Sequence, residues 1–188
     1  MQNTKKCADE CAHGTKLPIM KEIAGLLNRM CSAGVITDYA VFGAAAQMRY
    51  TEPVATVDAD VLIEVPEPDK TDVLQPVFAF CTRNGYAISS DTVLAGAWPV
   101  HFIPVFSPLT REAVEQAETV DFDGVPIRVV RADYLAVIAL SVGRVKDSLR
   151  IMALLEAGSV RADELRRLAE RHGLSQSWER FAKRFLDE

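Results

Sequence analysis

Residues 39–65 read YAVFGAAAQMRYTEPVATVDADVLIEV, and the rest of the chain is organised around this stretch. Tyr39–Phe42 is a short apolar run, too brief for a helix, and it predicts a buried strand. Gly43 then opens a run of small, helix-tolerant residues, which predicts a turn followed by a short helix. Asp58 and Asp60 lie near the start of a run that alternates with period two, as a second strand does.

The two aspartates predict a metal site. Side chains two positions apart on a strand point to the same face and lie roughly 7 Å apart along the chain, so Asp58 and Asp60 could converge on one divalent cation. The alternative is a solvent-facing strand surface that continues to Glu64, although Asp is disfavoured in strands. Gly43 likewise has a plain interpretation as a turn.

Composition bounds the class of protein. The chain has 188 residues, of which 49% are hydrophobic and 25% charged, as expected for one globular domain or one domain with an appended bundle. A formal charge of −5 argues against a nonspecific nucleic-acid coat, although a local basic patch stays open. No run approaches the roughly 18 apolar residues of a membrane span, and the polar start MQNTKKCADE lacks the apolar core of a secretion signal. We therefore expect a cytoplasmic protein with no membrane partner.

The cysteines fit reduced thiols better than a disulfide framework, which is typical of much shorter secreted chains. Cys7, Cys11 and His13 lie close together, but their spacing matches no common zinc pattern and no second ligand pair follows. We expect this segment to belong to a flexible leader.

Three regions are expected: a flexible leader at 1–14, an α/β core at 15–130 and a helical region at 131–188 that packs on the core. Asp123-Gly124 between two strand-like runs is a strong hairpin signal. Apolar periodicity and turn residues predict helices at 17–30, 71–84, 108–117, 133–142, 146–157, 161–172 and 176–186, and strands at 39–42, 57–65, 86–90, 100–106, 119–122 and 125–130, with 86–90 and 100–106 expected to pair.

The order Gly43 … Thr56-Val57-Asp58-Ala59-Asp60 after a short strand resembles the nucleotidyltransferase superfamily, which has the polymerase-β-like fold. The segment ALSVGRVKDSLRIMALLEAG (139–158) looks like the helical part of small bacterial nucleotidyltransferases of the abortive-infection toxin (AbiEii-like) branch. With PVHFIPVF and VDFDGVPIRVVRADYL, the likeness runs from about residue 38 to the C-terminus. It implies an α+β fold: a nucleotidyltransferase-like mixed sheet flanked by helices, with a C-terminal helical bundle.

The resemblance implies a metal-dependent enzyme that moves a nucleoside monophosphate from an NTP to an acceptor such as tRNA, a protein or a small molecule. Phosphoryl transfer chiefly needs charge neutralisation, which Mg²⁺ or Mn²⁺ supplies. The implied roles are catalysis and metal binding for Asp58 and Asp60, and nucleotide binding for Gly43 and Ala44 through their backbone and for Arg144 and Lys146 through their charge.

Three positions depart from the family pattern. Ala44 follows Gly43 where a glycine or serine is usual, His101 stands where a third carboxylate is common, and Ser141 stands where a lysine is expected. Imidazole at position 101 favours a softer metal than Mg²⁺, so His101 is a conditional metal ligand, with a core or cleft histidine as the alternative. These departures favour a second interpretation: a catalytically impaired, nucleotide-binding protein or a toxin–antitoxin component with a cognate partner.

The basic residues Arg144, Lys146 and Arg150 also have two interpretations. Such residues ordinarily form a solvated loop and helix face. The functional alternative is that they line a cleft and contact the triphosphate, with Asp147 orienting one of them through a charge-assisted hydrogen bond.

Overall fold

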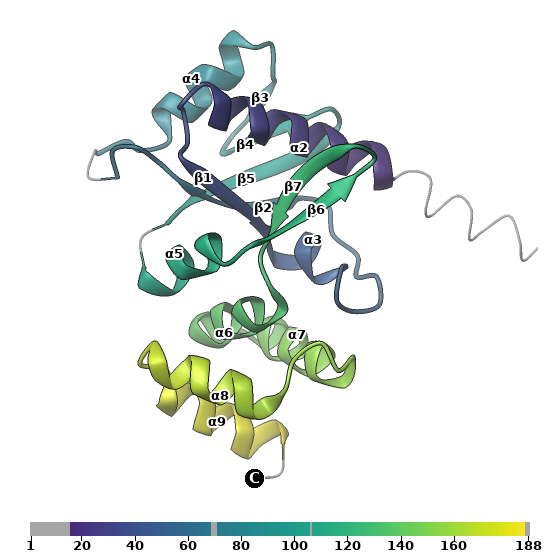
Figure 1. Ribbon diagram of the computed structural model, residues 1–188, viewed down its shortest axis with the longest axis vertical. Coiled ribbons are helices and arrows are strands. Elements are labelled where there is room, and N and C mark those ends of the chain that lie inside the picture. Colours follow the sequence, from purple (N-terminus) through teal and green to yellow (C-terminus); the bar gives the residue numbers. More distant parts are fainter. Residues whose placement is uncertain (1–15, 69–70, 106, 187–188) are drawn as a thin grey trace, which may run out of the picture.

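The computed structural model describes residues 16–68, 71–105 and 107–186. Within these ranges the chain forms a seven-stranded mixed sheet and eight helices (Figure 1). The α+β class with a mixed sheet flanked by helices is therefore confirmed. Cys7, Cys11 and His13 lie outside the described residues.

The sheet has the order β3-β4-β5-β2-β1-β7-β6. β2 is antiparallel to β1 and parallel to β5, β7 is parallel to β1, and the outer pairs β3/β4, β4/β5 and β6/β7 are antiparallel. The strands are β1 (Asp38–Phe42), β2 (Ala59–Glu64), β3 (Ile88–Ser89), β4 (Thr92–Ala95), β5 (Trp98–Pro104), β6 (Glu118–Phe122) and β7 (Val125–Val129).

The core forms where the central strands are covered on both faces. Helix α2 (Lys16–Ser32) packs against β7, β6 and β4, and α5 (Pro108–Glu115) packs against β1 and β2. α2 buries Ile23, Leu27 and Met30 completely, which follows from their three- and four-residue spacing. The helix predicted at 17–30 is thus confirmed, and Gly34, two residues after its last residue, takes φ +67.

Two short helices connect the strands. α3 (Gly43–Gln47) follows β1 without an intervening loop, and α4 (Gln75–Arg83) follows β2. Asp72 Oδ1 accepts from the backbone N–H of Gln75 at 3.0 Å, which satisfies a donor at the first residue of α4. Ser107 caps α5 through the backbone N–H of Thr110.

After Val129 every described element is a helix: α6 (Ala132–Val142), α7 (Val145–Glu156), α8 (Ala162–Arg171) and α9 (Ser175–Phe185). α6 is the centre of this group, because eight of its 11 residues are buried and it contacts α5, α3, α7, α8 and α9. α6 thereby joins the helical region to the sheet (Figure 1). No helix in the described part of the chain is long and apolar enough to cross a membrane.

The second strand of the opening stretch is shorter than predicted. It begins at Ala59, so Asp58 lies in a bend before the strand, and Val57 is 78% exposed although its alternation predicted burial. Leu62, on the same strand face as Asp60 by alternation, is buried. Leu62 is buried because β2 is an interior strand of the sheet and helices cover both of its faces. The alternation of buried and exposed residues that the sequence predicts is therefore not observed in this strand.

The predicted pairing of 86–90 with 100–106 is wrong. An additional strand, β4, pairs with both: β3 with β4 around Ser90, which has φ +57, and β4 with β5 around Gly96, which has φ +63. β5 is consequently an interior strand beside β2, and Pro104 is tolerated because it is the last residue of that strand.

The bounds of β2 predict unequal effects on stability at two apolar positions. Ile63→Ala should lower the free energy of unfolding by about 2–5 kcal/mol, because Ile63 is fully buried in the central strand. Val57→Ala should change it by no more than about 0.5 kcal/mol, since Val57 faces solvent. Urea unfolding with unchanged m-values measures both. Equal losses would mean that Val57 is part of the core.

Candidate functional site

Gly43 lies beside the Asp60 side chain because β1 and β2 are antiparallel neighbours. Phe42, the last residue of β1, pairs with Asp60. Gly43 has φ +68, which non-glycine residues adopt only at a cost. A Cβ at this position would also overlap Asp60 Oδ2. Two independent constraints, backbone conformation and a close carboxylate, therefore require glycine here.

Asp58 and His101 join this group from two directions. Thr56 Oγ1 lies 3.1 Å from Asp58 Oδ1 and 3.0 Å from the Asp58 backbone oxygen, and it steadies the bend before β2. Asp60 pairs with His101 across the parallel strands β2 and β5. His101 Nε2 is 3.9 Å from Asp58 Oδ2, and His101 Nδ1 is 3.7 Å from Asp91 Oδ2. Folding thus brings together Asp58, Asp60, His101 and Gly43.

Asp60 is the electrostatic centre of the group. Burial, followed by the neighbouring Asp58 carboxylate, raises the pKa of Asp60, while the charges of His101, Arg150 and Lys146 lower it. The Asp60 side chain accepts no hydrogen bond from the residues that the structure describes. A carboxylate that is mostly removed from water and lies next to another carboxylate favours a bound cation.

Arg150 and Lys146 on α7 supply positive charge to Asp60. The Arg150 side chain is only 17% exposed, and its Nε donates to Gln47 Oε1 at 3.0 Å. Gln47 is the last residue of α3, the helix that Gly43 begins. Arg150 therefore links the glycine turn to the helical region. Burial lowers the pKa of its guanidinium, while the charges of Asp147 and Asp60 raise it.

Asp147 holds two arginines. It is 1% exposed and accepts from Arg144 Nε at 2.7 Å and from the Arg144 backbone N–H at 3.2 Å. Arg150 Nη1 lies 3.5 Å from Asp147 Oδ1. The charge-assisted bond predicted for Asp147 is present, and it keeps Arg144 at the start of α7.

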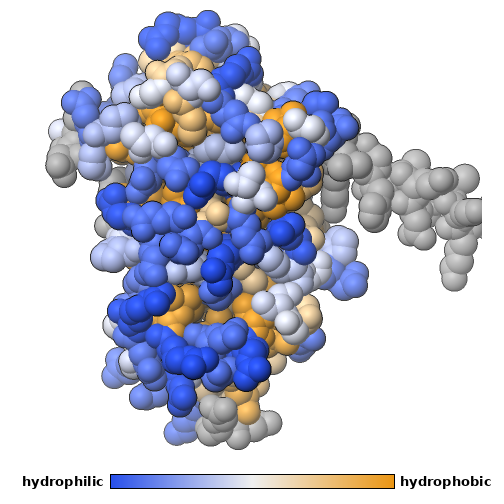
Figure 2. Space-filling view, in the orientation of Figure 1, coloured by the Kyte–Doolittle hydropathy of each residue, from blue (hydrophilic) through white to orange (hydrophobic). Residues whose placement is uncertain are grey.

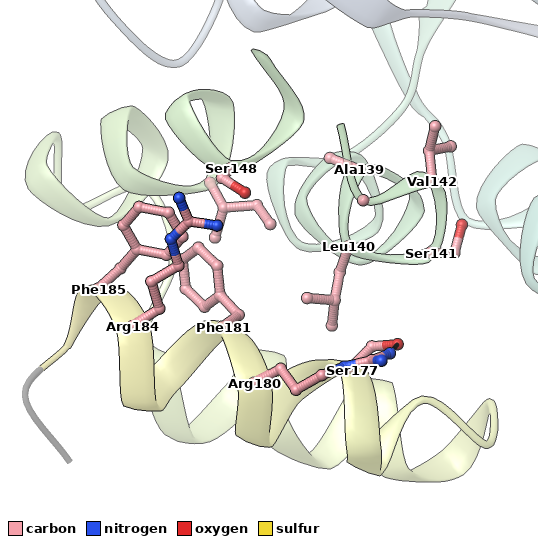
Figure 3. A pocket seen from close by; sticks show the side chains of 12 residues that line it. Ala139, Leu140, Ser141, Val142, Ser148, Ser177, Arg180, Phe181, Arg184 and Phe185 are labelled. Atoms are coloured by element: carbon pink, nitrogen blue, oxygen red, sulfur yellow. Dashed lines mark hydrogen bonds between the residues drawn. The ribbon is translucent and has the colours of Figure 1, made fainter. Parts of the chain in front are cut away.

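The remaining residues named from the sequence lie around the group of Asp58, Asp60, His101 and Gly43 or away from it. Ala44 is half-buried in the first turn of α3, and Lys146 is exposed on α7. Ser141 donates to the backbone oxygen of Ile138 at 2.7 Å and lines a groove between α6, α7 and α9 (Figure 3). Ser141 therefore caps a turn of α6 and does not supply the charge that a lysine would.

Asp58 and Asp60 are the candidate ligands for a divalent cation. Among the described residues, no three His, Cys, Asp or Glu side chains are grouped to hold a metal ion. Asp58 and Asp60 nevertheless fit a hard cation, because they are paired carboxylates and one of them is largely buried without a hydrogen-bond donor. Further coordination positions would fall to oxygens from substrate or water.

Three neighbours of the site were given no role from the sequence: Thr56 beside Asp58, Asp91 beside His101, and Gln47 beside Arg150. Only Thr56 had a local signal, since it lies two residues before Asp58. Asp91 reaches the site through the β3/β4 turn, and Gln47 through packing of α7 on α3. Neither contact has a sequence pattern.

Solved structures share this arrangement of strands and helices. An antigenic nucleotidyltransferase-like protein from Paracoccidioides brasiliensis superimposes with a TM-score of 0.53 and 14% identity, covering 86% of this chain and 93% of the other. The antibiotic-resistance factor ANT(2'')-Ia gives a TM-score of 0.53 and 13% identity, covering 91% and 98%. The fold is therefore nucleotidyltransferase-like.

No protein-family model matches the chain, and no curated protein matches it. At 13–14% identity, these two solved structures establish the fold alone. The resemblance to the abortive-infection toxin branch stays a prediction.

Gly43→Ala should destabilise the protein more than Gly34→Ala does. Both glycines have φ near +67, so each alanine costs about 1–2 kcal/mol in backbone energy. Only at position 43 does the new methyl meet a side chain, that of Asp60, whereas nothing lies within 4 Å of a Cβ at Gly34. Urea unfolding measures both. The excess should shrink in an Asp60→Ala background; an excess that persists there would locate the strain elsewhere.

Asp60→Asn should stabilise the protein at pH 7 when chelator removes metal ions. Because the folded-state pKa of Asp60 is raised, the folded protein holds this proton more tightly than the unfolded chain does. Wild-type stability is therefore lost, relative to the variant, as pH rises from the unfolded pKa of about 3.9 through the folded pKa.

Melting temperatures of wild type and Asp60→Asn between pH 3 and 7 test this, with Glu115→Gln as a control on the exposed end of α5. The difference between Asp60→Asn and wild type should be smallest near pH 3 and should grow with pH. A difference that does not change with pH would contradict the raised pKa.

Proposed function

We propose that the protein is a metal-dependent nucleotidyltransferase that transfers a nucleoside monophosphate from an NTP to an acceptor. The observation that carries the proposal is the contact of Gly43 with Asp60, beside Asp58, in a nucleotidyltransferase fold. It unites the glycine turn and the carboxylate pair in one place, as the resemblance implies.

In this proposal Asp58 and Asp60 hold Mg²⁺ or Mn²⁺, which when bound neutralises the phosphates and polarises the phosphorus. The backbone of Gly43 and Ala44 approaches the phosphates, and Arg144, Lys146 and Arg150 offset the negative charge that develops on the leaving group. Arg150 is held in place by Gln47 and Asp147, so its guanidinium needs little rearrangement on binding.

The reaction is an in-line displacement. An acceptor oxygen or nitrogen forms a bond to the α-phosphorus of the NTP, the bond from this phosphorus to the bridging oxygen breaks, and pyrophosphate departs. The acceptor loses its proton to solvent. Candidate acceptors are tRNA, a protein or a small molecule, and a cytoplasmic location would supply the NTP.

Incubation with each α-labelled NTP, Mg²⁺ or Mn²⁺ and candidate acceptors tests the proposal. We expect transfer from at least one NTP, and a loss of about 100-fold or more in Asp58→Asn and in Asp60→Asn, because each change removes charge at the metal. Glu115→Gln should react as wild type does. Transfer by the double variant Asp58→Ala/Asp60→Ala would contradict the proposal. So would a wild-type protein that shows no transfer with any combination of NTP, metal ion and acceptor.

One observation favours a second function. His101 lies on β5, where a third carboxylate is common in the family, and it pairs with Asp60 of β2. The two ring nitrogens of His101 face Asp58 and Asp91. Such a site would bind nucleotide without turnover, as a sensor or as part of a toxin–antitoxin pair. Calorimetry that detects NTP binding with no labelled product would favour this function over catalysis.

A further inference from the structure

A groove with a volume of about 400 Å³ lies between α6, α7 and α9, and neither Asp58 nor Asp60 lines it (Figure 3). Figure 3 shows Leu140 of α6 pointing into it above α9, with Phe181 on the facing side. Its polar lining consists of hydroxyl and guanidinium groups, and none of its 12 lining residues is acidic. These polar residues are Ser141, Ser148, Ser177, Arg180 and Arg184.

The two groove arginines differ from those on the neighbouring helix. Arg180 Nη2 donates to Ser177 Oγ at 3.3 Å, and Arg184 lies over the Phe185 ring at 5.1 Å from its centroid. Neither forms an ion pair with a carboxylate in the part of the chain that the structure describes. By contrast, the α8 arginines pair with acids, namely Arg166 with Glu170, Arg167 with Asp163 and Arg171 with Glu112. Among residues 16–68, 71–105 and 107–186, no carboxylate therefore pairs with the positive charge of the groove, in a chain whose formal charge is −5.

An exposed apolar ridge borders the groove. Val142, Val145 and Leu149 are 51%, 74% and 62% exposed, and they are three of the six large apolar side chains that stand out in the described ranges. Val142 also lines the groove, and Val145 lies one helical turn before the groove residue Ser148. Apolar surface also appears at the level of α6 and α7 in Figure 2. Contiguous exposed apolar surface rimmed by charge is typical of an interaction site.

We propose that this groove and its ridge are the docking surface for an acidic, amphipathic helix of a partner protein. The apolar face of such a helix would cover Leu140, Val145 and Leu149, and its carboxylates would pair with Arg180 and Arg184. A small molecule inside the groove would leave the ridge exposed. A two-fold dimer through this face is disfavoured by charge repulsion, because it would bring four groove arginines into one interface that no groove carboxylate lines. The proposal does not depend on nucleotidyl transfer.

The test is fluorescence anisotropy with the full chain and a labelled synthetic helix of about 18 residues, about five turns, with leucine on one face and glutamate on the other. We expect this peptide to bind, and binding to weaken with added salt. A peptide with lysine in place of glutamate should bind at least about tenfold more weakly, as should the double variants Arg180→Glu/Arg184→Glu and Val145→Ser/Leu149→Ser.

The control is Arg166→Glu/Lys183→Glu, which reverses one charge on α8 and one on α9 that line a separate pocket between these helices, and it should bind the peptide as wild type does. All substituted side chains in the groove variants are exposed, and circular dichroism checks that each variant folds. Absent binding, equal binding of the lysine peptide, or binding unchanged in Arg180→Glu/Arg184→Glu would overturn the proposal.

Two further results would also overturn it by assigning the surface to another occupant. One is displacement of the peptide by a single-stranded RNA oligonucleotide at lower concentration than unlabelled peptide requires. The other is a homodimer, seen by sedimentation, that Val145→Ser/Leu149→Ser dissociates. Neither measurement uses NTP, so a failed docking test leaves the transferase proposal standing.

Discussion

The approach of Gly43 to the Asp60 carboxylate is the constraint on which the site depends. Antiparallel pairing of β1 with β2 puts the chain reversal at the end of β1 directly beside the start of β2. Only a residue without a Cβ fits there, since both the positive φ and the carboxylate exclude a side chain. The small residues that follow let α3 pack closely on both strands, with Ala46 and Gln47 buried.

The same arrangement explains how the helical region takes part in the site. Two carboxylates beside each other destabilise a closed core unless positive charge faces them. α7 supplies that charge, and Arg150 is fixed by Gln47 of α3 at one end and by buried Asp147 at the other. Ser159, after α7, donates to the backbone oxygen of Tyr50 at 2.6 Å, which is a second tie to the segment after α3. Glycine turn and basic helix are therefore held as one unit.

Local patterns predicted the elements well and the contacts between them less well. The helices, the Asp123-Gly124 hairpin and the opening strand-turn-helix were predictable because caps, glycines and apolar spacing act within a few residues. Burial of Leu62, exposure of Val57 and the extra strand β4 were not, because they depend on which strands become interior to the sheet. Asp58 and Asp60 could be named from sequence, whereas Asp91 and Gln47 reach the site only through tertiary folding.

Helix α7 explains why exposed apolar residues alternate with charged ones in the segment VKDSLR (145–150). At about 100° per residue, Lys146, Asp147 and Arg150 share one side of the helix, and Val145, Ser148 and Leu149 share the opposite side. The first side is committed to Asp60 and Gln47. Ile151 and Leu154 anchor α7 in the core, whereas Val145 and Leu149 lie outside it. A single exposed apolar residue is ordinary, but Val142, Val145 and Leu149 are exposed close together in the chain, and contact with a second molecule would explain such a group.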